Sequence, residues 1–277
     1  MTADAALARE PGVGPLLRSW RTRRRISQLD LSIEAEISTR HLSFVETGRS
    51  RPSREMVLRL SESLDVPLRD RNRLLLAAGY APAYAETPVD GPDLAALRGT
   101  VREVLAGHEP FPTVVVDRAW TLLEANAGVA VLLEGVAEEL LEPPVNVLRV
   151  GLHPKGLAPR IVNLGEWRAH LLDRLRREAE WTADPGLTDL YRELCAYPGA
   201  DSGASPSGAA ATAALAVPLR LRHGREELAL LSTVATFGTP VDITVSELRI
   251  ESFLPADRAT SRALHAAVAA LTDADPA

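Results

Sequence analysis

The chain has 277 residues, a formal net charge of −6 and a single cysteine, and its length suits two domains better than one compact core. One cysteine excludes an internal disulfide bond and a zinc site built on several thiolates, and we expect Cys195 to be a small buried thiol. No apolar run reaches the roughly 18 residues of a membrane helix, and the first residues lack the pattern of a signal peptide. We therefore expect a cytoplasmic protein with no membrane partner.

Positive charge is concentrated in the N-terminal part of the chain. Residues 1–80 contain fourteen arginines, no lysine and ten acidic residues, a net charge of +4, which leaves −10 for residues 81–277. A basic segment within an acidic protein is typical of a domain that binds a polyanion. The N-terminal part is therefore the candidate for such a partner.

Short helices separated by strong start and stop signals fill the region from Pro15 to Ala78. The first is predicted at about residues 14–24, with Leu17 and Trp20 on its apolar side. The starts and stops of the next four helices are marked by Ser27, Ser38, Gly48, Pro52, Ser53, Pro67 and Gly79. The sequence therefore predicts an all-α five-helix bundle over residues 1–80.

The third helix, over residues 38–47, separates into two faces. Leu42 and Val45 point towards the interior, whereas hydroxyl and basic side chains occupy the other face near the helix N-terminus, where a recognition helix meets base edges. A helix N-terminus also favours phosphate, so Gln28 at the start of the second helix is expected to cap one. The predicted DNA contacts are Gln28, Ser38, Thr39, Arg40, Ser43, Phe44, Arg49 and Arg51.

Two alternatives stay open for this region. The helices could form a dimerisation module with a solvated arginine face, because charge runs are usually solvated. Phe44 could touch a thymine methyl group or pack on the protein scaffold. Arg49 and Arg51, in the exit loop, are expected to contact the DNA backbone, which positions a protein without reading sequence.

The stretch SQLDLSIEAEISTRHLSFVETGRSRPSREMVLRLSESLDV, residues 27–66, resembles the helix-turn-helix of the XRE family, which is related to phage repressors. The shared features are the glutamine that opens the second helix, the serine before the third, Glu-x-Gly after it and Pro-Ser before the fourth. The resemblance covers about 65 residues and implies a homodimer that binds a double-stranded DNA operator. Glu36 departs from the pattern, because the family commonly has a left-handed glycine in this turn.

Residues 81–93 are proline-rich and are predicted to be a linker to a domain over residues 94–277. That domain reads as α+β: a helix from residue 94, a hairpin over 113–125, a helix opened by Asn126 and further helices over 138–196. A second hairpin turns at His223 and Gly224, a strand is predicted over 242–254, and a last helix over 256–271.

Several stretches of this domain, among them VVVDRAWTLLEAN, NVLRVGLHP, EWRAHLLDRL and ELRIESFLPAD, resemble XRE regulators that carry an MmyB-like ligand-binding domain. The resemblance implies a PAS-like sheet with helices packed over it and, for some members, a bound fatty acid or similar apolar molecule. The residues expected to line an apolar cavity are Trp120, Leu122, Leu148, Leu152, Trp167, Leu171 and Phe237, although each could simply fill the core.

Polar residues of the same domain are candidates for the ligand's head group. Arg149 and His153 are four residues apart, so on a helix they share a face that could receive a carboxylate. Alternatively, either side chain is solvated or paired with a neighbouring acid. Asn126 is a candidate contact as well, although a helix cap is the more ordinary role for it.

Catalysis finds no support in the motifs. No histidine pair has metal-ligand spacing, and the chain has neither a Gly-x-Ser-x-Gly elbow nor a phosphate-binding loop. Glu166 and His170 share a helix face, but such a pair is usually a surface pair. We expect no enzyme, metal or cofactor, and predict a transcription regulator gated by a fatty-acid-like molecule. The alternative is a constitutive DNA-binding regulator whose C-terminal domain only dimerises or recruits proteins.

Overall fold

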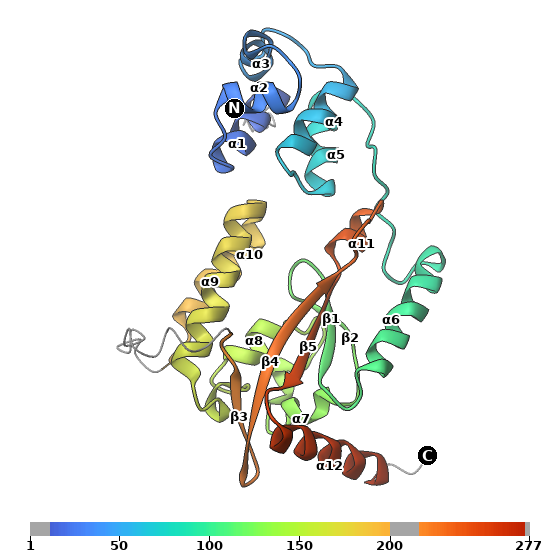
Figure 1. The fold of residues 1–277 in the computed structure, drawn as a ribbon, viewed down its shortest axis with the longest axis vertical. Coiled ribbons are helices and arrows are strands. Elements are labelled where there is room, and N and C mark those ends of the chain that lie inside the picture. The colour runs from blue at the N-terminus through green and yellow to red at the C-terminus, as the bar shows by residue number, and fades with distance from the viewer. Residues whose placement is uncertain (1–11, 200–215, 275–277) are drawn as a thin grey trace, which may run out of the picture. The chain divides into compact units, whose positions relative to one another are not determined.

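The computed structural model describes residues 12–199 and 216–274, which form two compact units (Figure 1). The first holds the described residues up to Glu86 together with the short segments Glu180–Thr182 and Val241–Ile243, and the second holds the other described residues from Thr87 onward. The predicted linker boundaries at 81 and 93 stay a prediction. Asn72 holds the start of this segment against its own unit, because its Oδ1 accepts hydrogen bonds from the backbone amides of Ala83 and Tyr84 at 2.8 and 3.1 Å.

Five helices make up the N-terminal unit, as predicted: α1 (Val13–Arg23), α2 (Gln28–Glu34), α3 (Thr39–Glu46), α4 (Arg54–Ser63) and α5 (Leu68–Ala77). Three of them begin where a serine hydroxyl accepts a hydrogen bond from a backbone amide of the first turn. Ser27 caps α2, Ser38 caps α3 and Ser53 caps α4. One apolar core, which includes Leu17, Leu42 and Leu60, holds the bundle together.

Left-handed residues turn the chain between these helices. Gly48 and Gly79, which follow α3 and α5, have φ angles of 73° and 78°. Glu36, between α2 and α3, also adopts this conformation, with φ of 54°. A side chain in this region costs roughly 1 kcal/mol relative to glycine, which the packing of α2 and α3 has to offset.

The C-terminal unit contains a five-stranded antiparallel sheet in the order β2-β1-β5-β4-β3. Its strands are β1 (Thr113–Val116), β2 (Leu122–Ala125), β3 (Leu219–His223), β4 (Glu226–Thr236) and β5 (Arg249–Pro255). Its helices are η1 (Pro92–Leu94), α6 (Ala95–Gly107), α7 (Val129–Leu133), η2 (Glu138–Leu140), α8 (Val147–Leu152), η3 (Ala158–Arg160), α9 (Leu164–Thr182), α10 (Pro185–Ala196), α11 (Ile243–Glu247) and α12 (Arg258–Ala274). The predicted α+β class with helices over the sheet is confirmed.

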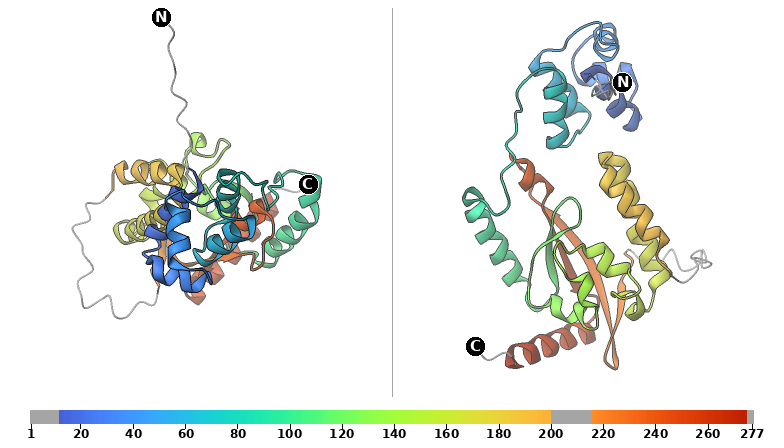
Figure 2. Two further views of the ribbon diagram at one scale, coloured as in Figure 1. Left: turned by 90° about the horizontal axis from the view of Figure 1, so that it is seen from above. Right: turned by 180° about the vertical axis from the view of Figure 1, so that it is seen from behind.

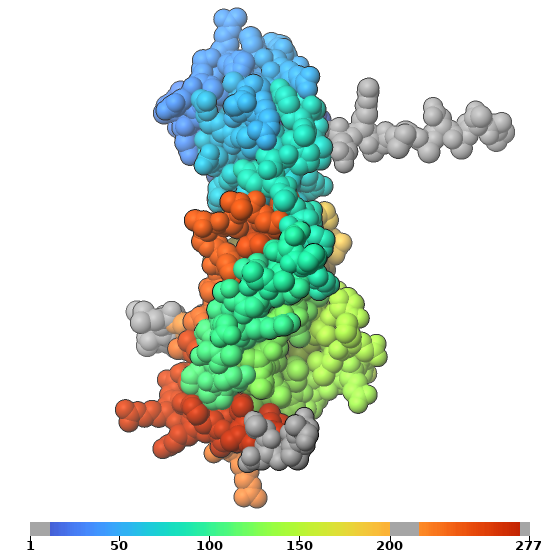
Figure 3. All heavy atoms as spheres, turned by 90° about the vertical axis from the view of Figure 1, so that its right-hand side faces the viewer, coloured from blue at the N-terminus to red at the C-terminus, as the bar shows by residue number. Residues whose placement is uncertain are grey.

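Helices cover both faces of this sheet. One face packs against α7, α8, α9, α10 and α12 in the main core, and α7 and α8 are seen across it in the rear view of Figure 2. On the other face, Val101 and Leu105 of α6 pack against Val115, and Figure 3 shows α6 crossing that side of the unit. β1 is therefore buried along its whole length.

Three expectations for this unit were wrong. Residues Ile243–Glu247, predicted to be strand, form α11, because tertiary contacts override the strand preference of β-branched residues. Asn126 does not cap α7, whose N-cap is Gly128. Cys195 is exposed, because it lies on the outer side of α10 while its neighbour Leu194 faces the core. No helix within residues 12–199 and 216–274 is long and apolar enough to cross a membrane.

Candidate nucleic-acid interface and ligand cavity

Helix α3 presents the two faces that its sequence predicts. Leu42 and Val45 are fully buried in the core of the bundle, whereas Arg40 is exposed and Ser43 is half-buried. Ser38 is also exposed, and its hydroxyl accepts a hydrogen bond from the backbone amide of His41 at 3.1 Å. The apolar face thus fixes the rotation of α3 about its axis, and the polar face is left accessible.

A buried acid at the end of α3 ties three helices together. The side chain of Glu46 is 1% exposed and accepts hydrogen bonds from Arg21 of α1, from Nε at 2.6 Å and from Nη2 at 2.9 Å. Gln28 of α2 donates its amide Nε2 to the same carboxylate at 2.7 Å. Burial alone raises the pKa of Glu46, but the hydrogen bonds from Arg21 and Gln28 outweigh it, so the pKa lies below its ordinary value.

This network holds Gln28, a predicted phosphate contact, in place. An amide group carries two N–H donors, so Gln28 retains one after its bond to Glu46. The hydroxyl of Thr39, another predicted contact, lies 2.9 Å from the hydroxyl of buried Ser32 in α2. Both side chains are therefore positioned by the scaffold, and their contacts with DNA stay predictions.

The ring of Phe44 lies between two predicted DNA-binding arginines. The guanidinium carbon of Arg40 is 5.3 Å from the ring centroid, and that of Arg49 is 6.0 Å from it. Cation–π contacts of this kind are worth about 0.5–1 kcal/mol at exposed sites. Phe44 is half-buried, and its ring contacts orient the two cations. These contacts do not decide whether Phe44 touches a thymine methyl group or packs on the protein scaffold.

Arg51 has a structural role that the sequence does not reveal. Its Nε and Nη2 atoms donate to the carbonyl oxygen of Ala78, at the end of α5, at 3.0 and 2.7 Å. Its guanidinium carbon lies 5.2 Å from the ring of Tyr80, whose hydroxyl donates to the carbonyl oxygen of Pro52. A Cβ atom at Gly79 would approach Arg51 Nη2 to 2.6 Å. The exit loop of α3 is thus fixed to the end of α5.

An apolar cavity of about 210 Å³ lies within the C-terminal unit, between the sheet and the helices over it. Of the residues predicted to line such a cavity, Leu122, Leu148, Trp167 and Leu171 do so. The remaining lining residues are Val114, Val129, Leu132, Leu133, Leu141, Val145, Val147, Val150, Gly151, Leu157, Leu219, Glu251 and Phe253. Apolar walls with few polar groups are typical of a small-molecule site.

Four other candidates lie elsewhere. Leu152 is buried in the main core and Phe237 packs on the α6 side of the sheet. The side chain of Asn126 accepts a hydrogen bond from the amide of Thr113 at 2.9 Å and donates to Phe111, so it ties β1 to the preceding loop. Trp120 is 1% exposed and does not line the cavity.

Trp120 instead forms the centre of a charged cluster beside the sheet. Its Nε1 donates to Glu178 at 3.2 Å, and Glu178 also pairs with Arg249. The guanidinium carbons of Arg174 and Arg249 lie 4.3 and 5.0 Å from its ring. The turn that carries Trp120, whose own φ is 65°, is therefore fixed to α9 and β5.

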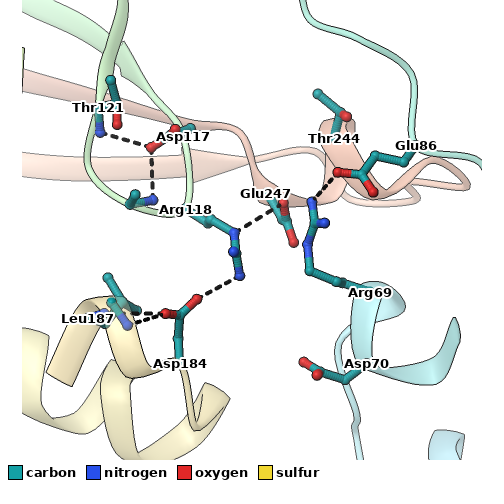
Figure 4. A network of polar contacts seen from close by, with 12 residues as sticks. Arg69, Asp70, Glu86, Asp117, Arg118, Thr121, Asp184, Leu187, Thr244 and Glu247 are labelled. Carbon is teal, nitrogen blue, oxygen red and sulfur yellow. Dashed lines mark hydrogen bonds and ion pairs between the residues drawn. The ribbon is translucent and has the colours of Figure 1, made fainter. Parts of the chain in front are cut away.

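Further polar contacts hold the same turn (Figure 4). Arg118 pairs with Asp184, its Nη1 lying 2.6 Å from Oδ2, and its Nε lies 3.9 Å from Glu247. Asp117 accepts a hydrogen bond from the amide of Thr121 at 2.8 Å, which closes the turn. These contacts make the β1–β2 connection a rigid part of the unit.

Neither predicted head-group residue lines the cavity. Arg149 pairs with Glu193 through two hydrogen bonds of 2.8 Å, and these bonds lower the pKa of Glu193. His153 stacks edge-on against Tyr197, with ring centroids 5.0 Å apart. Burial and a hydrogen bond to Glu193 raise the pKa of Tyr197 to about 12. The pairing with a neighbouring acid is thus the observed state of Arg149.

The cavity does contain one acid that sequence reasoning missed. Glu251 on β5 is 4% exposed, lines the cavity and accepts hydrogen bonds from Arg174 Nη1 at 3.0 Å and Ser232 Oγ at 2.5 Å. Glu251 shares a sheet face with Phe253 two residues later, which also lines the cavity, so strand alternation was the available signal.

Glu166 and His170, the candidate acid–base pair, each make other contacts within the C-terminal unit. No group of three metal-ligating side chains gathers within the described parts of the chain. Glu166 accepts a hydrogen bond from Asn163 at 3.1 Å. The ring of His170 lies against Trp167, and burial lowers its pKa. These contacts give the two residues ordinary structural roles.

Comparison with known proteins identifies both units. Residues 97–267 match the model of the MmyB-like transcription regulator ligand-binding domain, and residues 17–70 match a helix-turn-helix model. No curated protein is significantly similar to the chain. A solved structure described as an RNA-binding light-oxygen-voltage receptor is similar, with 14% identity and a TM-score of 0.25 over 94% of this chain. The match spans 63% of that receptor's chain.

A helix-turn-helix unit joined to a ligand-binding unit defines the class, which is that of DNA-binding transcription regulators. The ligand-binding model covers more than half of the sequence, so the chain belongs to the MmyB-like transcription regulators. The resemblance to the XRE-type helix-turn-helix is likewise confirmed. Both matches point to transcription regulation rather than to catalysis.

Proposed function

We propose that the chain is a sequence-specific regulator whose α3 reads a DNA operator and whose activity is gated by an apolar, fatty-acid-like molecule in the C-terminal cavity. The carrying observation is the position of α3: Leu42 and Val45 are buried while Arg40 on the opposite face is exposed. The exposed hydroxyl and guanidinium groups match what base edges and phosphates accept in the major groove.

DNA contacts are divided between reading and positioning. Arg40, Ser43 and Thr39 belong to the reading set, because they lie in the first turns of α3. Ser38, Gln28 and the exit-loop arginines belong to the positioning set, since backbone contacts fix register without reading sequence. Phe44 supports both sets by orienting Arg40 and Arg49.

Gating by a ligand rests on the cavity. Its walls are almost wholly aliphatic or aromatic, which suits an alkyl chain. A ligand shifts an equilibrium only when it binds one conformation better than the other. Allosteric couplings of about 1–3 kcal/mol change affinity by roughly 5- to 150-fold, so DNA affinity should change by a factor in this range when the cavity fills.

A homodimer is part of the same proposal. Helix-turn-helix proteins commonly bind two half-sites about one helical turn apart, and operators then mirror the twofold symmetry of the protein. The expected operator is roughly palindromic. Analytical ultracentrifugation of the full chain with a selected duplex should give two chains for each duplex, and one chain for each duplex would contradict the dimer.

The direct test combines DNA selection with lipid extract. The full chain is used to select duplexes from a random-sequence pool, and its affinity for the winner is then measured with and without a total lipid extract. A recurring sequence motif and an affinity that changes with the extract support the proposal. A motif without any response to the extract favours the alternative, a constitutive regulator whose C-terminal unit only dimerises or recruits proteins.

A further inference from the structure

Strand β4 is longer than the strand that pairs with one of its edges. β3 pairs with residues 226–230 of β4, whereas β5 pairs with residues 230–236. Figure 1 shows β4 continuing beyond the end of β3. Pro218 immediately precedes β3 and has no backbone N–H group, so it cannot extend this ladder. Within the described residues, 231–236 of β4 are therefore paired along one edge alone.

The open edge of β4 presents the backbone groups of every second residue. The carbonyl oxygen of Ala229 accepts a hydrogen bond from the amide of Ala256, just past β5, at 2.8 Å, so Ala229 points towards β5. Because successive residues of an antiparallel strand alternate between its two edges, the N–H and C=O groups of Ser232, Val234 and Thr236 point the other way. No backbone group of residues 12–199 and 216–274 bonds to them from that side.

The side chains along this edge are small, uncharged and open to solvent. Residues 233–236 are exposed, and Val234, a large apolar residue, is 43% exposed. No charged residue occurs between Glu227 and Asp242, in a chain of which 25% is charged. Proteins usually protect an open edge with charges, proline or a bulge, but the register of residues 230–236 against β5 is unbroken. An unprotected edge of this kind is a template for pairing with another strand.

A second copy of the chain suits this edge better than other strands do. Two identical segments that pair antiparallel are self-complementary about a twofold axis, which is the symmetry of a homodimer. Residues 81–277 carry a net charge of −10, so a neutral edge is where two copies meet without like charges facing each other. Residues 200–215 of the same chain consist largely of alanine, glycine and proline, which have little preference for strands.

We infer that two copies of the chain join through residues 232–236 of β4, which pair antiparallel about a twofold axis at Val234 and form one continuous sheet across the dimer. In this register Val234 faces Val234 of the second copy, and Thr233 faces Ala235 of the second copy. Cross-strand pairs of β-branched side chains stabilise such a sheet. The inference rests on the proposed function, because it names the surface that forms the proposed homodimer.

Charges placed across the twofold axis test this surface. Thr233→Lys with Ala235→Lys sets lysine against lysine in both cross-strand pairs, whereas Thr233→Lys with Ala235→Glu sets lysine against glutamate. The dissociation constant of the dimer is measured by sedimentation equilibrium of the full chain without DNA. The first variant should raise it by about tenfold or more, because like charges directly opposite each other destabilise paired strands. The second variant should restore it to within about threefold of the unaltered value.

A matched control adds the same charges elsewhere. Ala266→Lys with Ala270→Lys places two lysines on exposed positions of α12 and should leave the dissociation constant unchanged. Circular dichroism checks the fold of each variant. Should the lysine–lysine variant not fold, Val234→Lys makes the same test, since it sets one lysine against its own copy on the axis.

Two results would overturn the inference. A folded lysine–lysine variant that dimerises like the unaltered chain would show that the dimer forms through another surface, and the proposed homodimer would stand. An unaltered chain that stays monomeric without DNA would show that the edge serves residues 200–215 or a strand of another protein. In either case the selection of DNA duplexes tests the proposed function separately.

Discussion

Arg21 of α1 and Glu46 of α3 form a two-pronged ion pair, and Glu46 is almost completely buried beneath it. Because Gln28 of α2 donates to the same carboxylate, one acid fixes the relative positions of the three helices that a helix-turn-helix needs. The geometry of the DNA-reading face therefore depends on a residue that does not belong to that face.

Removal of this acid should destabilise the N-terminal unit. Glu46→Ala leaves the Arg21 guanidinium partly buried without its partner, and breaking a buried pair typically costs about 3 kcal/mol or more. The measurement is the free energy of unfolding from urea denaturation followed by circular dichroism. Glu62→Ala, which removes an exposed acid from α4, should change it by less than about 0.5 kcal/mol. Equal effects of the two substitutions would show that the buried pair is not what holds the helices.

Acid should weaken the same contact. The pKa of Glu46 is lower in the folded protein than its ordinary value of about 4.3, so the folded state favours the ionised form. Its contribution to stability is then fully present above pH of about 4.3 and is lost as the pH falls through the folded-state pKa. The difference in unfolding free energy between the unaltered chain and Glu46→Gln should be constant from pH 7 to 5 and shrink below that. A difference that grows in acid would contradict the assignment.

Filling the cavity should abolish ligand binding without harming the fold. Gly151 of α8 lines the cavity, and a Cβ atom built there meets no atom within 4 Å. Gly151→Leu places a side chain in this space and raises helix propensity by roughly 1 kcal/mol. The thermal midpoint should not fall, whereas the rise in midpoint that we expect when the unaltered chain is mixed with the total lipid extract should disappear. Gly99→Leu, on the exposed side of α6, is the control that should keep the response.

Local signals in the sequence were enough to predict the five helices of the N-terminal unit and the orientation of α3. Serine caps and left-handed glycines define where its helices begin and end, and the apolar spacing of Leu42 and Val45 gives the orientation of α3. These are short-range effects, so they are legible in a single sequence. The structural role of Arg51 could not be predicted in this way, because its hydrogen-bond acceptor, the carbonyl oxygen of Ala78, is 27 residues further along the chain.

The residues around the ligand cavity could be predicted only in part, because some of their contacts join residues that are far apart in the sequence. Leu148, Trp167 and Leu171 were predicted to line it and do so. The partner of Arg149 is Glu193, which is 44 residues further along the chain, and no local pattern pairs them. Glu251 was missed although it shares a strand face with Phe253, because a charged residue in a strand is ordinarily expected to face solvent and the helices that cover this face come from distant parts of the chain.

The central claim is that α3 reads DNA through Arg40, and one comparison tests it most directly. The affinities of the unaltered chain, Arg40→Ala and Arg73→Ala are measured by fluorescence anisotropy on a selected duplex and on a scrambled one at fixed salt. Arg73 lies on α5, exposed and paired with Asp70, so its removal changes the charge equally without touching α3. Arg40→Ala should weaken binding to the selected duplex by about 1–3 kcal/mol and reduce discrimination against the scrambled one, while Arg73→Ala should leave discrimination unchanged. Normal affinity and normal discrimination in Arg40→Ala would contradict the account.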